Sequence, residues 1–212
     1  MKKFVLGIGG YIGSGKTTAG RIFEKFGVRF IDADAVVDDL YRKGEDGYRK
    51  IMSFFGEEYL KRDGELNRKK LAQTVFADPK KLRILQDLIH PLVTNRIRKM
   101  IDREVGMCET SEKECGAIRV FVIEATYFQR KHLLALVDAI LWIECKKEIL
   151  FERLRNERGM EHDFFEKIFR VQVPPPRKDF VVENNGSMKN FDLALGKVWK
   201  KIQKEVKNMC KI

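Results

Sequence analysis

The stretch Gly10-Tyr11-Ile12-Gly13-Ser14-Gly15-Lys16-Thr17 is the strongest indication of the fold in this sequence. It matches the pattern G-x-x-x-x-G-K-[ST] in full. An apolar run at residues 4–8 precedes it as a strand, and residues 18–26 follow with helical spacing. Glycines let successive backbone N–H groups point at one anion, and the N-terminus of the next helix adds partial positive charge. The stretch therefore predicts a phosphate-binding loop.

Each residue type in this loop has an expected part in binding ATP and Mg²⁺. Lys16 is expected to reach the β- and γ-phosphates, and the hydroxyl of Thr17 is expected to ligate Mg²⁺. A glycine-rich turn with a chance lysine is the alternative, and the flanking strand and helix argue against it. The residues predicted to bind the nucleotide are Gly10, Ile12, Gly13, Ser14, Gly15, Lys16, Thr17 and Thr18.

Five short apolar runs predict the strands of an α/β fold. They cover residues 4–8, 28–31, 118–123, 138–143 and 180–182. The third and fourth are apolar almost throughout, as strands covered on both faces are. Because strands and helices alternate from the start, the sequence predicts a five-stranded parallel sheet flanked by helices.

The long segment between the second and third strands is predicted to be helical. A turn is predicted at residues 61–64, and Asn67 is expected to N-cap a helix. His90-Pro91 predicts a break between two helices. A loop or frayed helix end is expected at residues 104–116. The organisation predicted is a nucleotide-binding core of residues 1–34 and 117–212, with a helical substrate-binding insert of residues 35–116.

The charge of the chain favours an anionic partner. Its 42 lysines and arginines against 31 aspartates and glutamates give a net charge of +11, and the two kinds are interleaved. That pattern suits a nucleotide at least as well as a polynucleotide. A small-molecule substrate with no nucleic-acid partner is therefore expected, and a nucleic-acid-binding ATPase is kept as an alternative.

Other patterns bear on location and partners. No apolar run is long enough to span a membrane, and the N-terminal run ends at glycine too early for a signal peptide. The 4 cysteines form no C-x-x-C pair, which favours free thiols. We expect a cytoplasmic protein without a membrane partner. The sequence leaves the oligomeric state open.

The rest of the sequence narrows the class of phosphate-loop protein. A GTPase would carry N-K-x-D, whereas residues 189–192 read Lys-Asn-Phe-Asp in the wrong order. A motor ATPase or helicase would have a longer chain and a strand ending in paired acids. A small-molecule kinase needs the loop, an acceptor site, a base and a lid, and it fits this length.

Asp32 and Asp34 follow the second predicted strand. Ligands of parallel sheets bind at the carboxyl ends of the strands. A carboxylate there can accept the proton of an acceptor hydroxyl during phosphoryl transfer, or hold Mg²⁺ through water. One of the two could instead only cap the next helix. Either residue is therefore a candidate base.

These residues together resemble the dephospho-CoA kinase family. The loop and Ile31-Asp32-Ala33-Asp34 are its most diagnostic elements, and the likeness extends to about Ser187. Weaker elements are Asp63-Gly64-Glu65-Leu66-Asn67-Arg68, Val75-Phe76, Ile89-His90-Pro91, Gln172 and Asn184-Asn185-Gly186-Ser187. The chain departs from the family at Gly9, where Thr is usual, at Tyr11, where Gly is usual, and across residues 125–129.

The resemblance implies a P-loop kinase fold, with a helical CoA-binding insert and a helical lid at about residues 152–173. It implies phosphorylation of the ribose 3′-hydroxyl of dephospho-CoA by ATP, the last step of coenzyme A synthesis. Another nucleoside or nucleotide kinase is the alternative. By the same resemblance Asp34 is favoured over Asp32 as the base.

The resemblance also assigns binding residues. Arg68 would hold an anionic part of dephospho-CoA, as an arginine fork suits a pyrophosphate. His90 would bind the substrate, although a structural hydrogen bond is the more common use of such a histidine. Lid arginines would neutralise charge on the transferred group, and family spacing favours Arg153 and Arg158 over Arg155 and Arg170. Asn184 and Asn185 would lie near the adenine.

Overall fold

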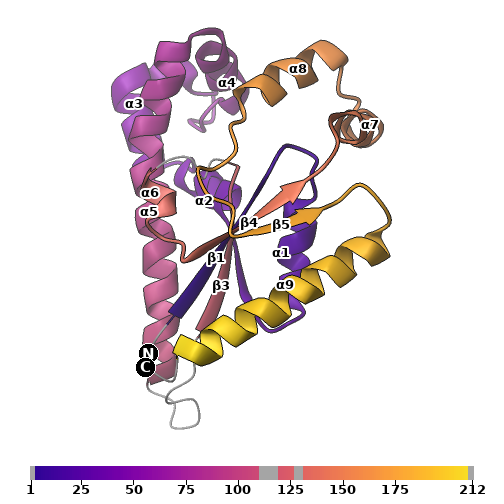
Figure 1. The fold of residues 1–212 in the computed structure, drawn as a ribbon. Coiled ribbons are helices and arrows are strands. Elements are labelled where there is room, and N and C mark those ends of the chain that lie inside the picture. Colours follow the sequence, from indigo (N-terminus) through magenta and orange to yellow (C-terminus); the bar gives the residue numbers. More distant parts are fainter. Residues whose placement is uncertain (1–2, 110–118, 127–130, 210–212) are drawn as a thin grey trace. The chain divides into compact units, whose positions relative to one another are not determined.

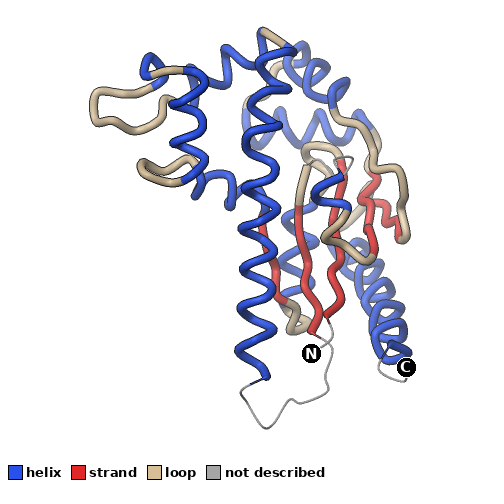
Figure 2. The backbone as a smooth tube through the Cα atoms, turned by 90° about the vertical axis from the view of Figure 1, so that its left-hand side faces the viewer, coloured by secondary structure: helices blue, strands red, loops and turns tan. Residues whose placement is uncertain are grey.

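The computed structural model describes residues 3–109, 119–126 and 131–209, and within them five parallel strands form one sheet (Figures 1 and 2). The spatial order is β2-β3-β1-β4-β5. The strands are β1 (Lys3–Gly10), β2 (Arg29–Asp32), β3 (Arg119–Glu124), β4 (Ala139–Glu144) and β5 (Phe180–Glu183). The predicted parallel sheet is confirmed, with each strand within two residues of its predicted bounds.

The parallel register brings the carboxyl ends of neighbouring strands to one edge. Ile8 of β1 pairs with Glu124 of β3, and Asp32 of β2 pairs with the same Glu124. On the other side of β1, Gly10 pairs with Ile143 of β4. The end of β1 therefore lies between two strand ends that can supply side chains to whatever binds there.

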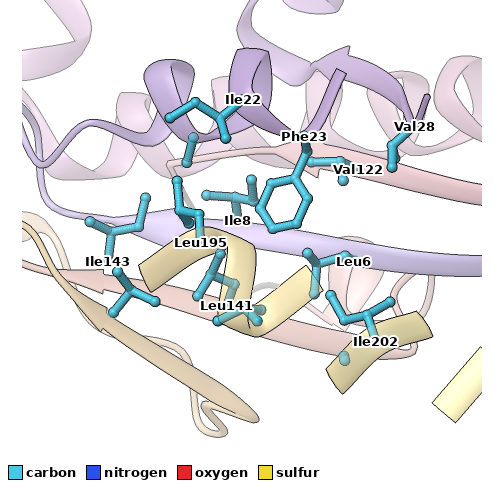
Figure 3. Close-up of a cluster of buried hydrophobic side chains, with 14 of the residues drawn as sticks. Leu6, Ile8, Ile22, Phe23, Val28, Val122, Leu141, Ile143, Leu195 and Ile202 are labelled. Carbon is cyan, nitrogen blue, oxygen red and sulfur yellow. The ribbon is translucent and has the colours of Figure 1, made fainter. Parts of the chain in front are cut away.

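The sheet and two helices share a large apolar core. Helix α1 (Lys16–Glu24) and the closing helix α9 (Met188–Met209) contribute to one cluster with β1, β3 and β4 (Figure 3). Phe23 of α1 and Leu195 and Ile202 of α9 are completely buried there. Full burial of one such side chain contributes about 1.5–3 kcal/mol. This packing fixes the start of α1 relative to the sheet.

Three further helices belong to the same unit as the sheet. They are α6 (Lys131–Leu134), α7 (Lys147–Arg158) and α8 (His162–Val171). Gly159 ends α7 in a left-handed conformation, with φ of 62°. Helix α8 ends before Pro174-Pro175-Pro176, with Gln172 as its C-cap, because proline lacks the N–H group that a further helical turn would need. Residues 1–32 and 101–212 make up this unit, and residues 33–100 form a second one.

The second unit is helical. Its helices are α2 (Ala33–Leu40), α3 (Asp46–Phe55), the 3₁₀ turn η1 (Glu57–Tyr59), α4 (Arg68–Ala77) and the first part of α5 (Pro79–Glu109). The predicted N-cap of α4 is confirmed, since the side-chain oxygen of Asn67 accepts a hydrogen bond from Lys70 N at 3.1 Å. The prediction for residues 104–116 is answered only in part, because α5 continues to Glu109 and residues 110–118 lie outside the described residues.

The predicted break at His90-Pro91 is wrong, because α5 runs through Pro91 without interruption. Leu85, Ile89, Val93 and Ile97 recur every four residues and are all buried, so one apolar stripe passes the proline. An interior proline costs roughly 3 kcal/mol, whereas each large apolar side chain buried beyond it contributes about 1.5–3 kcal/mol. Burial therefore outweighs the lost backbone hydrogen bond.

None of the helices in the described ranges has the length and apolar character needed to cross a membrane.

Candidate active site

The phosphate loop connects β1 to α1 through residues 11–15. Gly13 and Gly15 have positive φ angles of 77° and 95°, and Ser14 N donates to Tyr11 O at 3.0 Å, which closes a tight turn. Gly15 is the N-cap of α1 and has no side chain with which to cap it. The first N–H groups of α1 are therefore left without a side-chain cap and are available to an anion.

Close packing around the loop explains two of its glycines. A Cβ atom at Gly10 would lie 2.3 Å from Ser14 Oγ, and one at Gly15 would lie 2.6 Å from Asn184 Nδ2. Both distances are far inside van der Waals contact. Gly15 also has a left-handed backbone that other residues rarely adopt. The loop thus keeps its shape only with glycine at these positions.

The loop lysine lies against the loop itself. Lys16 is the first residue of α1, and its side chain is largely buried. Its Nζ atom donates to the carbonyl oxygen of Tyr11 at 3.2 Å. The positive charge is therefore held within the loop, where the terminal phosphates of a bound nucleotide would lie.

The structure adds a residue that the sequence did not single out. Glu124 ends β3, is buried, and its Oε1 atom accepts a hydrogen bond from Thr17 Oγ1 at 3.0 Å. Its only signal in the sequence is an acid at the end of an apolar strand, a position that the parallel sheet places beside β1. The pair combines a hydroxyl and a carboxylate, which are ligands that Mg²⁺ prefers.

Asp32 and Asp34 are two residues apart in the sequence but belong to different elements. Asp32 is the last residue of β2, is half-buried, and pairs in register with Glu124. Asp34 lies in the first turn of α2 and is exposed. Asp32 belongs to the unit of the sheet, whereas Asp34 belongs to the second unit.

Arg153 and Asn184 brace the phosphate loop from outside. The Arg153 guanidinium donates to Gly13 O at 3.4 Å and to Asn184 O at 2.9 Å. Asn184, which is buried, donates from Nδ2 to Ser14 O at 2.9 Å. Asn185 accepts a hydrogen bond from Lys146 N at 2.8 Å through its Oδ1 atom. The loop after β5 is thus tied to both the phosphate loop and the start of α7.

The remaining predicted site residues are spread over both units. Arg158 is the last residue of α7 and is exposed. In the second unit His90 lies within α5, half-buried, and Arg68 is the exposed first residue of α4. Thr18 is the third residue of α1 and is half-buried.

Arg68 has two neighbours in its own unit. It forms an ion pair with Asp38 of α2, and its Nη2 atom also donates to the Asp38 carbonyl at 2.9 Å. Its guanidinium carbon lies 5.7 Å from the centre of the Tyr41 ring. Burial raises the pKa of Tyr41 to about 12, against a smaller lowering by the Arg68 charge. Tyr41 is therefore a neutral phenol that offers Arg68 a flat ring face.

Cys145, just before α7, and Glu166, which pairs with α7, both have shifted pKa values. Burial raises the pKa of the Cys145 thiol, against a smaller opposite effect of the Arg153 charge. The thiol therefore stays protonated at neutral pH and donates to Asn184 O at 3.2 Å. The hydrogen bond from Lys147 lowers the pKa of Glu166, so that carboxylate is ionised and pairs α8 with α7.

The unit of the sheet therefore holds the parts of a nucleotide-phosphate site. Backbone N–H groups and Lys16 can bind terminal phosphates. Thr17 and Glu124 can hold a cation beside them. Asp32 lies at the end of the neighbouring strand, in register with Glu124, at the edge of the sheet where ligands of parallel sheets bind.

Comparison with known families and proteins gives a consistent result. The family model for dephospho-CoA kinase matches residues 4–190. The dephospho-CoA kinase of Carboxydothermus hydrogenoformans is 31% identical over 190 residues, which cover 88% of each chain. That of Aquifex aeolicus is 29% identical over 204 residues, which cover 94% of this chain and 98% of the relative.

Solved structures resemble the fold over almost the whole chain. The protein TT1252 from Thermus thermophilus has a TM-score of 0.73 at 24% identity and covers 95% of this chain and 98% of its own. Dephospho-CoA kinase from Campylobacter jejuni has a TM-score of 0.64 at 20% identity with the same coverage. At these identities the likeness concerns the fold, a parallel sheet with a phosphate loop.

Proposed function

This chain belongs to the dephospho-CoA kinase family and is a phosphotransferase, and we propose that it transfers the γ-phosphoryl group of ATP to the ribose 3′-hydroxyl of dephospho-CoA. The family agrees with the resemblance predicted from the loop and from Ile31-Asp32-Ala33-Asp34. The proposed partner is a small molecule, and the proposed compartment is the cytoplasm, which suits the free thiol of Cys145.

One observation carries this proposal in the structure. Lys16 and the hydrogen-bonded pair Thr17 and Glu124 lie together with the phosphate loop at the carboxyl edge of the sheet. Phosphoryl transfer needs mainly positioning and neutralisation of charge on the transferred group. The loop N–H groups and Lys16 meet that need for the β- and γ-phosphates.

We propose that Thr17 and Glu124 hold the Mg²⁺ ion that accompanies ATP. The donor set fits, because Mg²⁺ is usually bound with nucleotide through one or two oxygen side chains and several waters. The ion supplies positive charge that offsets the charge of the phosphate oxygens. Glu124 holds the Thr17 hydroxyl at 3.0 Å and so fixes its direction.

Activation of the acceptor is assigned to the aspartates. We propose that Asp34 takes the proton of the ribose 3′-hydroxyl as general base, with Asp32 as the second candidate. Arg68 binds an anionic part of dephospho-CoA, and for that it exchanges the Asp38 carboxylate for a phosphate. His90 is proposed to bind the same substrate from α5.

The lid contributes charge and the last loop contributes nucleotide contacts in this proposal. A hydrogen bond to Gly13 O holds the charged guanidinium of Arg153 beside the phosphate loop. Arg158 is exposed, and its side chain can turn toward the transferred group. We propose that Asn184 and Asn185 lie near the adenine; Asn184 also supports the loop through its hydrogen bond to Ser14 O.

The proposed activity is tested by release of ADP. The purified chain is incubated with ATP, Mg²⁺ and dephospho-CoA, and ADP is measured by a coupled assay against an ATP-only control. We expect turnover well above that control. Turnover with nucleosides or nucleoside monophosphates, together with none on dephospho-CoA, would contradict the proposed acceptor and favour the alternative nucleotide kinase.

The role of Glu124 gives a separate prediction. Glu124→Gln keeps the shape of the side chain but removes the charge that supports Thr17 and the cation. We expect the Mg²⁺ concentration for half-maximal turnover to rise by ~10–100-fold, as for other groups that orient metal ligands. The measurement is a Mg²⁺ titration of turnover at saturating substrates.

The matched control is Glu144→Gln at the end of the next strand. Glu144 is exposed and pairs with Lys178. Its Mg²⁺ dependence is expected to equal that of the wild type. Equal Mg²⁺ dependence in Glu124→Gln and the wild type would refute the role given to Glu124.

A further inference from the structure

The second residue of the phosphate loop carries an aromatic ring that packs against two other elements. The ring of Tyr11 stacks on Phe169 of α8, with centroids 4.4 Å apart and planes at 23°. It meets Trp142 of β4 edge to face, with centroids 5.5 Å apart and planes at 78°. Both geometries are favourable for aromatic pairs. Tyr11 therefore joins the loop to the sheet and to α8 at once.

The end of α8 is also bound to the loop through a buried amide. Gln172 follows the last residue of α8 and is 8% exposed. Its Oε1 atom accepts a hydrogen bond from Ile12 N at 2.9 Å. Since Ile12 follows Tyr11, two adjacent loop residues contact one end of α8, one through its ring and the other through its backbone.

Helix α8 is itself fixed to α7. Phe165 is buried with Leu150 and Leu154 of α7, and Tyr11, Ile12 and Phe169 pack against that cluster. Lys147 of α7 pairs with Glu166 at 2.6 Å and lies 5.1 Å from the centre of the Phe169 ring. The ring that Tyr11 stacks on is therefore held by contacts of its own.

The carbonyl group of Tyr11 serves the nucleotide site. It accepts hydrogen bonds from Ser14 N at 3.0 Å and from Lys16 Nζ at 3.2 Å. The first bond shapes the loop, and the second holds the lysine that the proposed function places on the phosphates. The Tyr11 carbonyl and the Ile12 N–H belong to one planar peptide group, which contacts α8 through the Tyr11 ring and through Gln172, so a shift of α8 would move the carbonyl.

We propose that Tyr11 is a positioning residue, whose stacking on Phe169 couples α8 to the phosphate loop and to Lys16. The stack transmits the position of α8 to the carbonyl that orients the lysine. This inference rests on the proposed function only in requiring that the loop binds the phosphates of ATP. Simple filling of the apolar cluster is the competing explanation of the ring.

The test uses Tyr11→Leu, Phe169→Leu and the double variant, because leucine keeps an apolar side chain but removes the stack. Affinity for a non-hydrolysable ATP analogue is measured by calorimetry, together with kcat and with KM for each substrate. We expect each single change to weaken analogue binding several-fold, up to about tenfold, in the range of aromatic pair energies. The KM for dephospho-CoA is expected to stay unchanged.

The coupling is read from the combination of variants. The double variant should bind the analogue about as weakly as either single one, since both remove the same stack. Tyr11→Phe keeps the ring and should bind the analogue with wild-type affinity. Phe164→Leu, an exposed aromatic on the same helix, is the matched control and should leave affinity unchanged.

Three results would overturn the inference. The first is a double variant whose loss of affinity equals the product of the two single losses. The second is wild-type affinity in Tyr11→Leu despite a lower melting temperature, as filling alone would predict. The third is a loss in Tyr11→Phe as large as in Tyr11→Leu. Analogue binding needs no acceptor, so the coupling can be read even if dephospho-CoA is not the substrate.

Discussion

Lys16→Ala is expected to abolish phosphoryl transfer and to weaken nucleotide binding. The side chain is the positive charge held within the loop, 3.2 Å from Tyr11 O, and the rest of the loop offers the phosphates backbone N–H groups. Removing a single group that neutralises transition-state charge typically costs 10²–10³-fold, and cationic groups in phosphoryl transfer reach higher values. We expect turnover to fall by ~10³-fold or more, measured as ADP formation at saturating ATP.

A matched variant separates this effect from a general loss of positive charge. Lys25 is the C-cap residue of the same helix and is exposed. Lys25→Ala removes the same charge at the other end of α1 and should retain wild-type turnover. Retention of full activity by Lys16→Ala would refute the assignment of the loop.

Asp34→Asn is expected to lower turnover by ~10²–10⁴-fold, the range for a lost general base. Asparagine has nearly the same shape as aspartate but is not a base at neutral pH. The variant should bind the ATP analogue with little change, because Asp34 is assigned to the acceptor and not to the nucleotide. The measurements are kcat with dephospho-CoA and analogue affinity by calorimetry.

Two neighbours serve as comparisons for this variant. Asp39 is an exposed residue of the same helix and forms a surface ion pair with Arg42. Asp39→Asn should therefore leave turnover unchanged. Asp32→Asn should cost less than Asp34→Asn if Asp34 is the base. Near-normal turnover in Asp34→Asn would show that its carboxylate does not take the proton.

The sequence was sufficient where local geometry decides the structure. The glycines of the loop predicted a backbone that turns its N–H groups toward one anion, and Gly13 and Gly15 do have the left-handed backbone that only glycine adopts easily. The apolar runs that became β3 and β4 are buried along most of their length, and together with the alternation of strands and helices they predicted a parallel sheet. The cap at Asn67 was likewise predictable, because it bonds only three residues along the chain.

The contacts that complete the site were beyond such reasoning, because they join distant parts of the chain. Thr17 and Glu124 are separated by 107 residues, and Ile12 and Gln172 by 160. Arg153 was predicted as a charge for the transferred group, and its bond to Gly13 O depends on how α7 packs beside the loop. No periodicity or spacing in the sequence encodes these pairs.

Pro91 illustrates the opposite error, in which a local rule predicted too much. Proline usually ends a helix because it lacks an N–H group. In α5 the apolar stripe that includes Ile89 and Val93 continues on both sides of it. The sum of burial along a long helix decided the outcome, and that sum depends on the packing of the whole unit.

The site described here should add one phosphoryl group to one hydroxyl of one substrate, and the position of that group can be observed directly. ³¹P NMR of a reaction with ATP, Mg²⁺ and dephospho-CoA should show a new phosphomonoester signal identical to that of authentic coenzyme A, growing in step with ADP. ADP that accumulates without this signal, or a monoester at another position, would contradict the account.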